Sequence, residues 1–197
     1  MQPRLALCGN VFPADGPDAV LAALRGPVRA WTDGLKAAGH VGPFGYGLHF
    51  SASAAAEIAG SKTLLQDIRE AMAAADVIAW TANAFPFGDF HASSVKESAF
   101  LPDWSSPERS EFTMQVAHLL AELAPEDDRP LSISTCPLGY GPDALAHPDT
   151  LKHLLFTAAC LQHLGKQYRR DFILAIEPEP DGNFERVSDL ATWLYHH

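Results

Sequence analysis

The chain has 197 residues, of which 47% are hydrophobic and 19% are charged, and 24 acidic against 14 basic side chains give a net charge of −10. This length and apolar content predict one compact domain with a buried core, and they exclude a disordered chain. The acidic balance disfavours a nucleic-acid partner, because phosphate contacts need clustered lysine and arginine. No apolar run approaches the roughly 18 residues of a membrane span.

The cysteines and the first residues indicate a cellular compartment. Cys8, Cys136 and Cys160 lie far apart and form no C-x-x-C pair, which argues against a disulfide framework and against a structural zinc site. The segment from Met1 to Asn10 has a single arginine and a four-residue apolar patch, unlike a secretory signal. We therefore expect free thiols and a cytoplasmic location.

Five short apolar runs are predicted to be β-strands. They are nearly continuously apolar or rich in small residues, which is typical of strands covered on both faces in a parallel sheet. The runs are Leu5–Phe12, Phe44–Phe50, Val77–Phe85, Leu131–Pro137 and Phe172–Glu177.

Residues with helical spacing separate these runs. The stripe from Leu21 to Leu35 contains Gly26-Pro27, which we expect to kink or split the helix. Ser61 is expected to cap a new helix, Ser105-Ser106 to open the next one, and Asp149 to cap the one after. The alternation of strands and helices predicts an α/β domain with a parallel sheet and right-handed crossovers.

Polar residues gather where the predicted strands end, which is where ligands bind in α/β folds. Glu177 ends the last run, so its carboxylate either binds a hard divalent cation or simply faces water. Asn83 ends the third run, where its amide can hydrogen-bond a hydroxylated ligand or a neighbouring backbone group.

The longest irregular segment, Phe85 to Trp104, is also a candidate site, because loops of about 20 residues in compact domains are usually functional. His91 and Lys96 within it could act as an acid/base or anion-binding pair. Alternatively, aromatic side chains such as Phe87 pin an ordered surface loop. The chain has no G-x-G-x-x-G, P-loop, G-x-S-x-G or H-E-x-x-H motif, which removes the simple nucleotide-binding, serine-hydrolase and zincin interpretations.

Three strand-end stretches resemble one known family. They are NAFPFGDFH at 83–91, SISTCPLGY at 132–140 and IEPEP at 176–180. In this order they resemble the E component of the Ebo-operon metabolite-traffic proteins, a branch of the xylose-isomerase-like TIM barrels. The resemblance implies a parallel (β/α) barrel, of which residues 1–197 would form one partial domain with only the first five βα units. At about 42 residues per unit, eight units would need about 330 residues.

The resemblance also implies roles for individual residues. Glu177 matches a glutamate that, in the catalytic relatives, is the first ligand of a divalent metal beside the proton-transfer chemistry. We therefore expect Glu177 to be catalytic and to bind Mn²⁺, Mg²⁺ or Zn²⁺, and His91 is a second catalytic candidate. The candidates for substrate binding are Asn83, Phe87, Lys96 and Trp104.

Three functions remain open from the sequence. The first is a metal-dependent enzyme like a sugar isomerase or epimerase, which moves a proton next to a carbonyl group of a small sugar-like or secondary-metabolite precursor. The second is a non-catalytic binding or scaffold protein for metabolite traffic. The third is an inactive fragment of a longer barrel, whose open edges would favour a homo-oligomer or a partner that supplies the missing strands.

Overall fold

The computed structural model describes residues 5–88, 96–141 and 147–197, with only the backbone of Lys96 and Glu97. Its strands are β1 (Ala6–Cys8), β2 (Phe44–His49), β3 (Val77–Asn83), β4 (Leu131–Thr135) and β5 (Phe172–Ile176). Its α-helices are α1 (Pro17–Ala23), α2 (Arg29–Ala37), α3 (Ala52–Ala59), α4 (Lys62–Ala74), α5 (Pro107–Leu123), α6 (Pro148–Tyr168) and α7 (Val187–His196). Short helical turns of other types cover Gly9–Val11, Leu24–Val28 and Lys96–Phe100.

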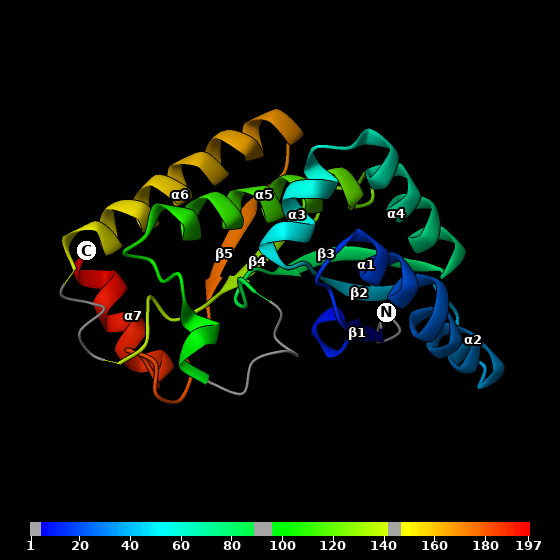
Figure 1. The fold of residues 1–197 in the computed structure, drawn as a ribbon, viewed down its shortest axis with the longest axis horizontal. Helices are drawn as coiled ribbons and strands as arrows, with labels where there is room; N and C mark the ends of the chain where they lie inside the picture. The colour runs from blue at the N-terminus through cyan, green and yellow to red at the C-terminus, as the bar shows by residue number, and fades with distance from the viewer. Residues whose placement is uncertain (1–4, 89–95, 142–146) are drawn as a thin grey trace.

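The five strands form one sheet in the order β1-β2-β3-β4-β5, and every neighbouring pair is parallel. Figure 1 shows these strands through the middle of the molecule, with α5 and α6 running along β3, β4 and β5. The predicted α/β class with a parallel sheet is therefore confirmed, and the arrangement is consistent with part of a βα barrel. Among the described residues, no helix is both long enough and apolar enough to cross a membrane.

The main hydrophobic core lies between the helices and one face of the sheet. In β4 the side chains of Leu131 and Ile133 are fully buried in this core, whereas Ser132 and Ser134, which alternate with them along the strand, are only half-buried. Alternate residues of a strand point to opposite faces of its sheet. The two serines therefore lie on the face turned away from the main core, which we call the open face.

A second cluster of buried residues lies beyond the carboxyl ends of β3, β4 and β5, and we call it the loop core. It joins three segments that follow these strands with parts of α6 and α7. Its buried members are Phe100, Trp104, Cys136, Leu138, Leu154, Phe184 and Leu190. Burial raises the pKa of the Cys136 thiol, so this cysteine serves as a small apolar side chain, as expected for a free buried thiol.

The first helical region follows the sequence prediction only in part. Gly26-Pro27 neither splits nor ends the helix, because the chain passes from α1 through one π-helical turn, Leu24–Val28, directly into α2. A π-turn absorbs the missing N–H of proline by widening the helix locally. The first strand is shorter than Leu5–Phe12, because the backbone enters a 3-10 turn at Gly9 and Phe12 donates its N–H to the Gly9 carbonyl.

The structure agrees with the predicted helix starts to different degrees. Ser61 caps α4 as expected, and its hydroxyl accepts from the Leu64 N–H over 3.3 Å. Ser106 occupies the cap position of α5 without a side-chain cap bond. Asp149 is not the cap of α6: His147 holds that position, and its ring nitrogen accepts from the Asp149 N–H over 3.3 Å.

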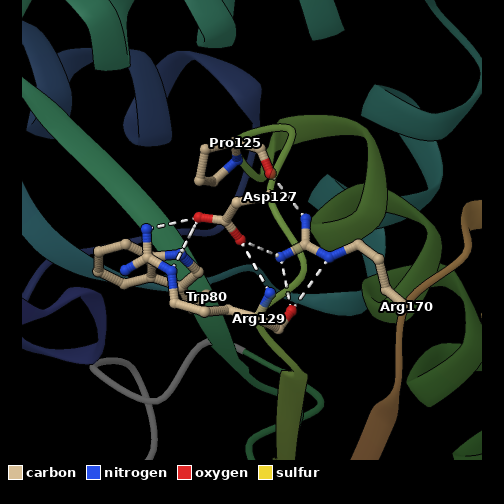
Figure 2. A network of polar contacts seen from close by, with 5 residues as sticks. All are labelled: Trp80, Pro125, Asp127, Arg129 and Arg170. Atoms are coloured by element: carbon tan, nitrogen blue, oxygen red, sulfur yellow. Dashed lines mark hydrogen bonds and ion pairs between the residues drawn. The ribbon is translucent and has the colours of Figure 1, made fainter.

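A polar network locks the amino ends of β4 and β5 (Figure 2). Asp127 binds Arg129 through Nε at 2.8 Å and Arg170 through Nη2 at 3.0 Å. Arg170 also donates to the carbonyls of Pro125 and Arg129, both at 2.7 Å. The Arg129 guanidinium lies 3.9 Å from the ring centre of Trp80, a cation–π contact. The network fixes the turn that precedes β4 and the turn that precedes β5, at the end of the sheet opposite to the carboxyl ends of the strands.

Candidate functional site

Strand register brings three polar side chains into one row of the open face. His49, Asn83 and Ser134 are consecutive partners across β2, β3 and β4. Ser134 is in turn the partner of Ala175 in β5, and Glu177 lies two residues further on the same face. The Glu177 N–H donates to the Thr135 carbonyl over 2.9 Å, so the backbone follows β4 one step beyond the end of β5.

The row below leaves space in front of the sheet, because its side chains are small. Gly47 pairs with Cys8 on one side and with Thr81 on the other, and Thr81 pairs with Ser132. The Ser132 hydroxyl donates to the Thr81 hydroxyl over 3.0 Å. A Cβ placed on Gly47 would lie 3.6 Å from the Thr81 methyl and 3.8 Å from the Cys8 sulfur. The centre of the open face therefore carries hydroxyl groups, and its side chains project only a short way from the sheet.

Asn83 has a structural task as well as a place in the row. Its side-chain oxygen accepts the N–H of Phe85 over 2.7 Å, which makes the local turn that asparagine commonly forms after a strand. The turn fixes the direction in which the chain leaves β3. Of the two alternatives for Asn83, this contact supports the one in which it satisfies a neighbouring backbone group.

A buried arginine organises the segment after β3. Arg109, in the first turn of α5, is fully buried. Its Nη1 donates to the carbonyls of Ala84 and Phe85, and its Nε donates to that of Pro102, each over 2.7 Å. Burial lowers the pKa of this guanidinium. One cation thus ties both ends of the long segment between β3 and α5 to the helix.

The sequence-predicted residues of that segment have different places. Trp104 is fully buried in the loop core. Phe87 packs edge-on against Phe112 of α5, with ring centres 5.2 Å apart. These positions agree with the interpretation that aromatic side chains pin the loop. His91 lies outside the described residues, and Lys96 begins the 3-10 turn Lys96–Phe100, with its side chain also outside them.

The structure thus brings Asn83 and Glu177 to the same end of the open face: Asn83 is in one row with Ser134 and Ala175, and Glu177 lies two residues beyond Ala175. It places Phe87 and Trp104 behind that face in packed positions. Within the described ranges no three histidine, cysteine or carboxylate side chains come together as metal ligands would. The described part of the site therefore offers hydrogen bonding and one carboxylate rather than a metal centre.

Two residues of this region are missing from the sequence-based site candidates. Ser134 lies in a predicted strand end, but only the strand register shows which face of the sheet it occupies. Arg109 carried a signal, because a cation in the first turn of a helix opposes the helix dipole and needs an explanation.

A surface hollow lies elsewhere, at the amino end of the sheet. It has a volume of about 490 Å³ and lies between α6 and the start of β5, next to Arg170 and Phe172. None of the predicted site residues lines it. We place the candidate site on the open face, because polar side chains from successive strands converge there.

Comparison with known proteins adds no relative: no protein-family model matches the chain, and no curated protein matches it. The assignment of function therefore depends on the geometry of the chain itself.

Proposed function

We propose that this protein binds a small, polyhydroxylated, sugar-like metabolite on the open face, at the carboxyl ends of β2 to β5. The observation that supports the proposal is the row of His49, Asn83 and Ser134 in consecutive register, with Glu177 on the same face. Imidazole, amide, hydroxyl and carboxylate groups together donate and accept hydrogen bonds, as ligand hydroxyls require. The small side chains of the row below leave room for the ligand.

Glu177 favours a second candidate function, proton transfer. A carboxylate at the mouth of a sheet can remove a proton next to a carbonyl group, as a general base does. His91 would return the proton in this scheme, and Lys96 would bind an anionic group of the substrate. With proton transfer, the protein would be an enzyme like a sugar isomerase or epimerase. With binding alone, it would catalyse no reaction and would act in metabolite traffic.

Isothermal calorimetry with D-xylose, D-ribose and myo-inositol tests the binding proposal. We expect one of these polyols to bind, and Glu177→Gln to weaken its binding roughly tenfold, since the charged carboxylate acceptor is replaced by a neutral amide. Ser134→Ala should weaken it about fivefold. Ser188→Ala, which changes an exposed hydroxyl on α7, is the matched control. The proposal fails if no polyol binds, or if Glu177→Gln and Ser134→Ala both bind the polyol as the wild type and the control do.

A divalent metal stays a prediction of the resemblance. The described residues provide Glu177 but no group of three ligands, so they do not fit a complete centre, and we derive no step through a metal. Calorimetric titration with Mn²⁺ tests this prediction. Equal binding to the wild type and to Glu177→Gln would remove Glu177 as a ligand.

The remaining parts of the proposal concern the type of barrel, its assembly and its location. We propose a barrel of the xylose-isomerase-like type and a cytoplasmic protein. We also propose that a second copy or a partner closes the sheet. Within the described residues, β1 pairs only with β2 and β5 only with β4, and Ile173 of β5 is 49% exposed. Exposed strand edges favour association, which light scattering measures directly.

A further inference from the structure

The outer edge of β5 presents backbone groups that have no partner among the described residues. On its inner side, the Asp171 carbonyl accepts from β4 over 2.8 Å, and the Glu177 N–H donates to β4 over 2.9 Å. Backbone groups alternate between the two sides of a strand, so those of Phe172 and Leu174 point away from β4. Within the described ranges β5 pairs with β4 alone. The N–H and C=O groups of this outer side can therefore bond to a further strand.

β5 lacks the features that usually protect an edge strand, which are charges, proline, bulges and shortness. All five residues of Phe172–Ile176 are apolar, and they pair with β4 without a bulge. Ile173 pairs with Ser132 on the open face and is 49% exposed. The other edge strand, β1, is only three residues long and ends at the 3-10 turn Gly9–Val11. β5 is therefore the edge that a second chain can extend.

Charged side chains flank β5 at both ends. Arg169 caps the end of α6 and Asp171 directly precedes the strand, whereas Glu177 directly follows it. Within the described residues, Arg169 and Glu177 form no ion pair. A second copy that runs antiparallel presents these charges in reverse order, so Arg169 of each copy comes to lie near Glu177 of the other. A parallel second copy in the same register places like charges side by side, which is unfavourable. The charges therefore favour the antiparallel arrangement.

We propose that β5 pairs with β5 of a second copy of this chain, antiparallel and about a two-fold axis at Ile173. The proposal rests on the exposed-edge part of the proposed function, which it commits to one partner, and it is independent of the polyol. In this register Ile173 lies opposite its own counterpart, and Asp171 lies opposite Ala175. A shift of the second copy by two residues places Asp171 opposite Glu177, and directly opposed like charges destabilise a sheet.

The pairing satisfies the outer edge of β5 and covers the exposed isoleucine. Phe172 of each copy faces Leu174 of the other, and a pair of this kind exchanges both N–H···O bonds. The two Ile173 side chains form a cross-strand pair, which is the unit of sheet stabilisation. The axis is perpendicular to the sheet, so the open faces of both copies lie on the same side. The second copy thereby adds a cation, Arg169, near Glu177 of the candidate site.

Disulfide cross-linking tests the interface. The exposed and half-buried native thiols are first removed as Cys8→Ser and Cys160→Ser. Directly opposed residues of a non-hydrogen-bonded antiparallel pair have Cα atoms about 4.5 Å apart, within the range of about 4.4–6.8 Å that a disulfide bridges. Under mild oxidation with copper phenanthroline, Ile173→Cys should form a covalent dimer at least about tenfold faster than the matched control Tyr195→Cys, whose position on α7 is 86% exposed.

The same chemistry tests the register. Asp171 and Ala175 are predicted to lie opposite each other across the two-fold axis, and neither lies opposite its own counterpart. A mixture of Asp171→Cys and Ala175→Cys chains should therefore cross-link faster than either chain alone. Equal rates in the mixture and in the separate chains would overturn the register.

Light scattering of the wild type needs no variant to fold and should show a dimer. A wild type that stays monomeric overturns the proposal together with association at the edge. A wild-type dimer in which Ile173→Cys cross-links no faster than Tyr195→Cys overturns this interface and leaves association in place. Oligomers beyond a dimer indicate head-to-tail pairing of β5 with β1 and also overturn it. Polyol calorimetry measures ligand binding separately, so failure of the dimer and failure of the binding proposal are distinguishable.

Discussion

Replacing Arg109 by methionine tests how the candidate site is held in place. Methionine keeps the length and the apolar stem of the side chain but has no donor. In the structure, Arg109 is fully buried and donates to the carbonyls of Ala84, Phe85 and Pro102, each over 2.7 Å, and to that of Phe100 over 3.4 Å. The substitution therefore leaves four carbonyls without the guanidinium; the contacts with Ala84 and Phe100 are buried, and those with Phe85 and Pro102 are partly buried.

The cost of Arg109→Met follows from these contacts. Leaving a buried acceptor unsatisfied costs about 1–3 kcal/mol, so the two buried carbonyls, those of Ala84 and Phe100, give a gross loss of about 2–6 kcal/mol, and the two partly buried carbonyls add less. The guanidinium itself is costly to bury, by several kcal/mol, and its removal offsets part of that loss. We expect a net decrease of about 3 kcal/mol in the free energy of unfolding, which is a large share of the stability of a domain.

Urea unfolding followed by circular dichroism measures this decrease. Arg109→Lys should lie between the wild type and Arg109→Met, because one ammonium group cannot reach three carbonyls in the geometry of a fork. Arg25→Met, on the exposed side of the first helical region, is the matched control and should change the free energy by less than about 0.5 kcal/mol. A loss below about 1 kcal/mol for Arg109→Met would refute the role we give to this side chain.

Two further predictions concern the opposite end of the sheet and its edge. Although partial burial alone would raise it, hydrogen bonds from Arg129 hold the pKa of Asp127 below its ordinary value of 3.8. The stability from this carboxylate is therefore present above about pH 4 and is lost as the pH falls through the lowered pKa of the folded state. Urea unfolding should show a difference between the wild type and Asp127→Asn that is constant from about pH 5 to 7 and shrinks toward pH 2; a difference that does not vary with pH contradicts this. Ile173→Lys places a charge on the exposed edge strand β5 and should reduce concentration-dependent light scattering, whereas Ser188→Lys on α7 should leave it unchanged; equal scattering from both variants would argue against association through this edge.

Much of the fold could be predicted from the sequence. All five apolar runs contain a strand, because a strand buried on one or both faces needs such a run whatever surrounds it. Ser61 caps a helix as predicted, since an N-cap is a local arrangement of a few residues. The ends of elements were less accurate. Gly26-Pro27 does not break the helix, because the π-turn at Leu24–Val28 accommodates the proline.

The candidate site was harder to predict, for a physical reason. Which face a residue such as Ser134 occupies depends on the register of its strand with its neighbours, and register is a tertiary property. The sequence indicated that Asn83 and Glu177 lie at strand ends, and the structure places both there. The sequence could not indicate that the Trp104 side chain is fully buried, or that Arg109 holds the segment after β3, because these contacts join residues that are far apart along the chain.

The loop core has a consequence for how this protein can change during evolution. In many α/β folds each loop at the carboxyl ends of the strands varies independently, since it stands on the sheet by itself. Here the segments after β3, β4 and β5 share Phe100, Trp104, Leu138 and Phe184 in one buried cluster. A substitution in one segment therefore has to be accommodated by the other two. Changes at these buried positions are therefore coupled, and libraries that vary the buried positions of all three segments together should retain more folded variants than libraries that vary those of one segment alone.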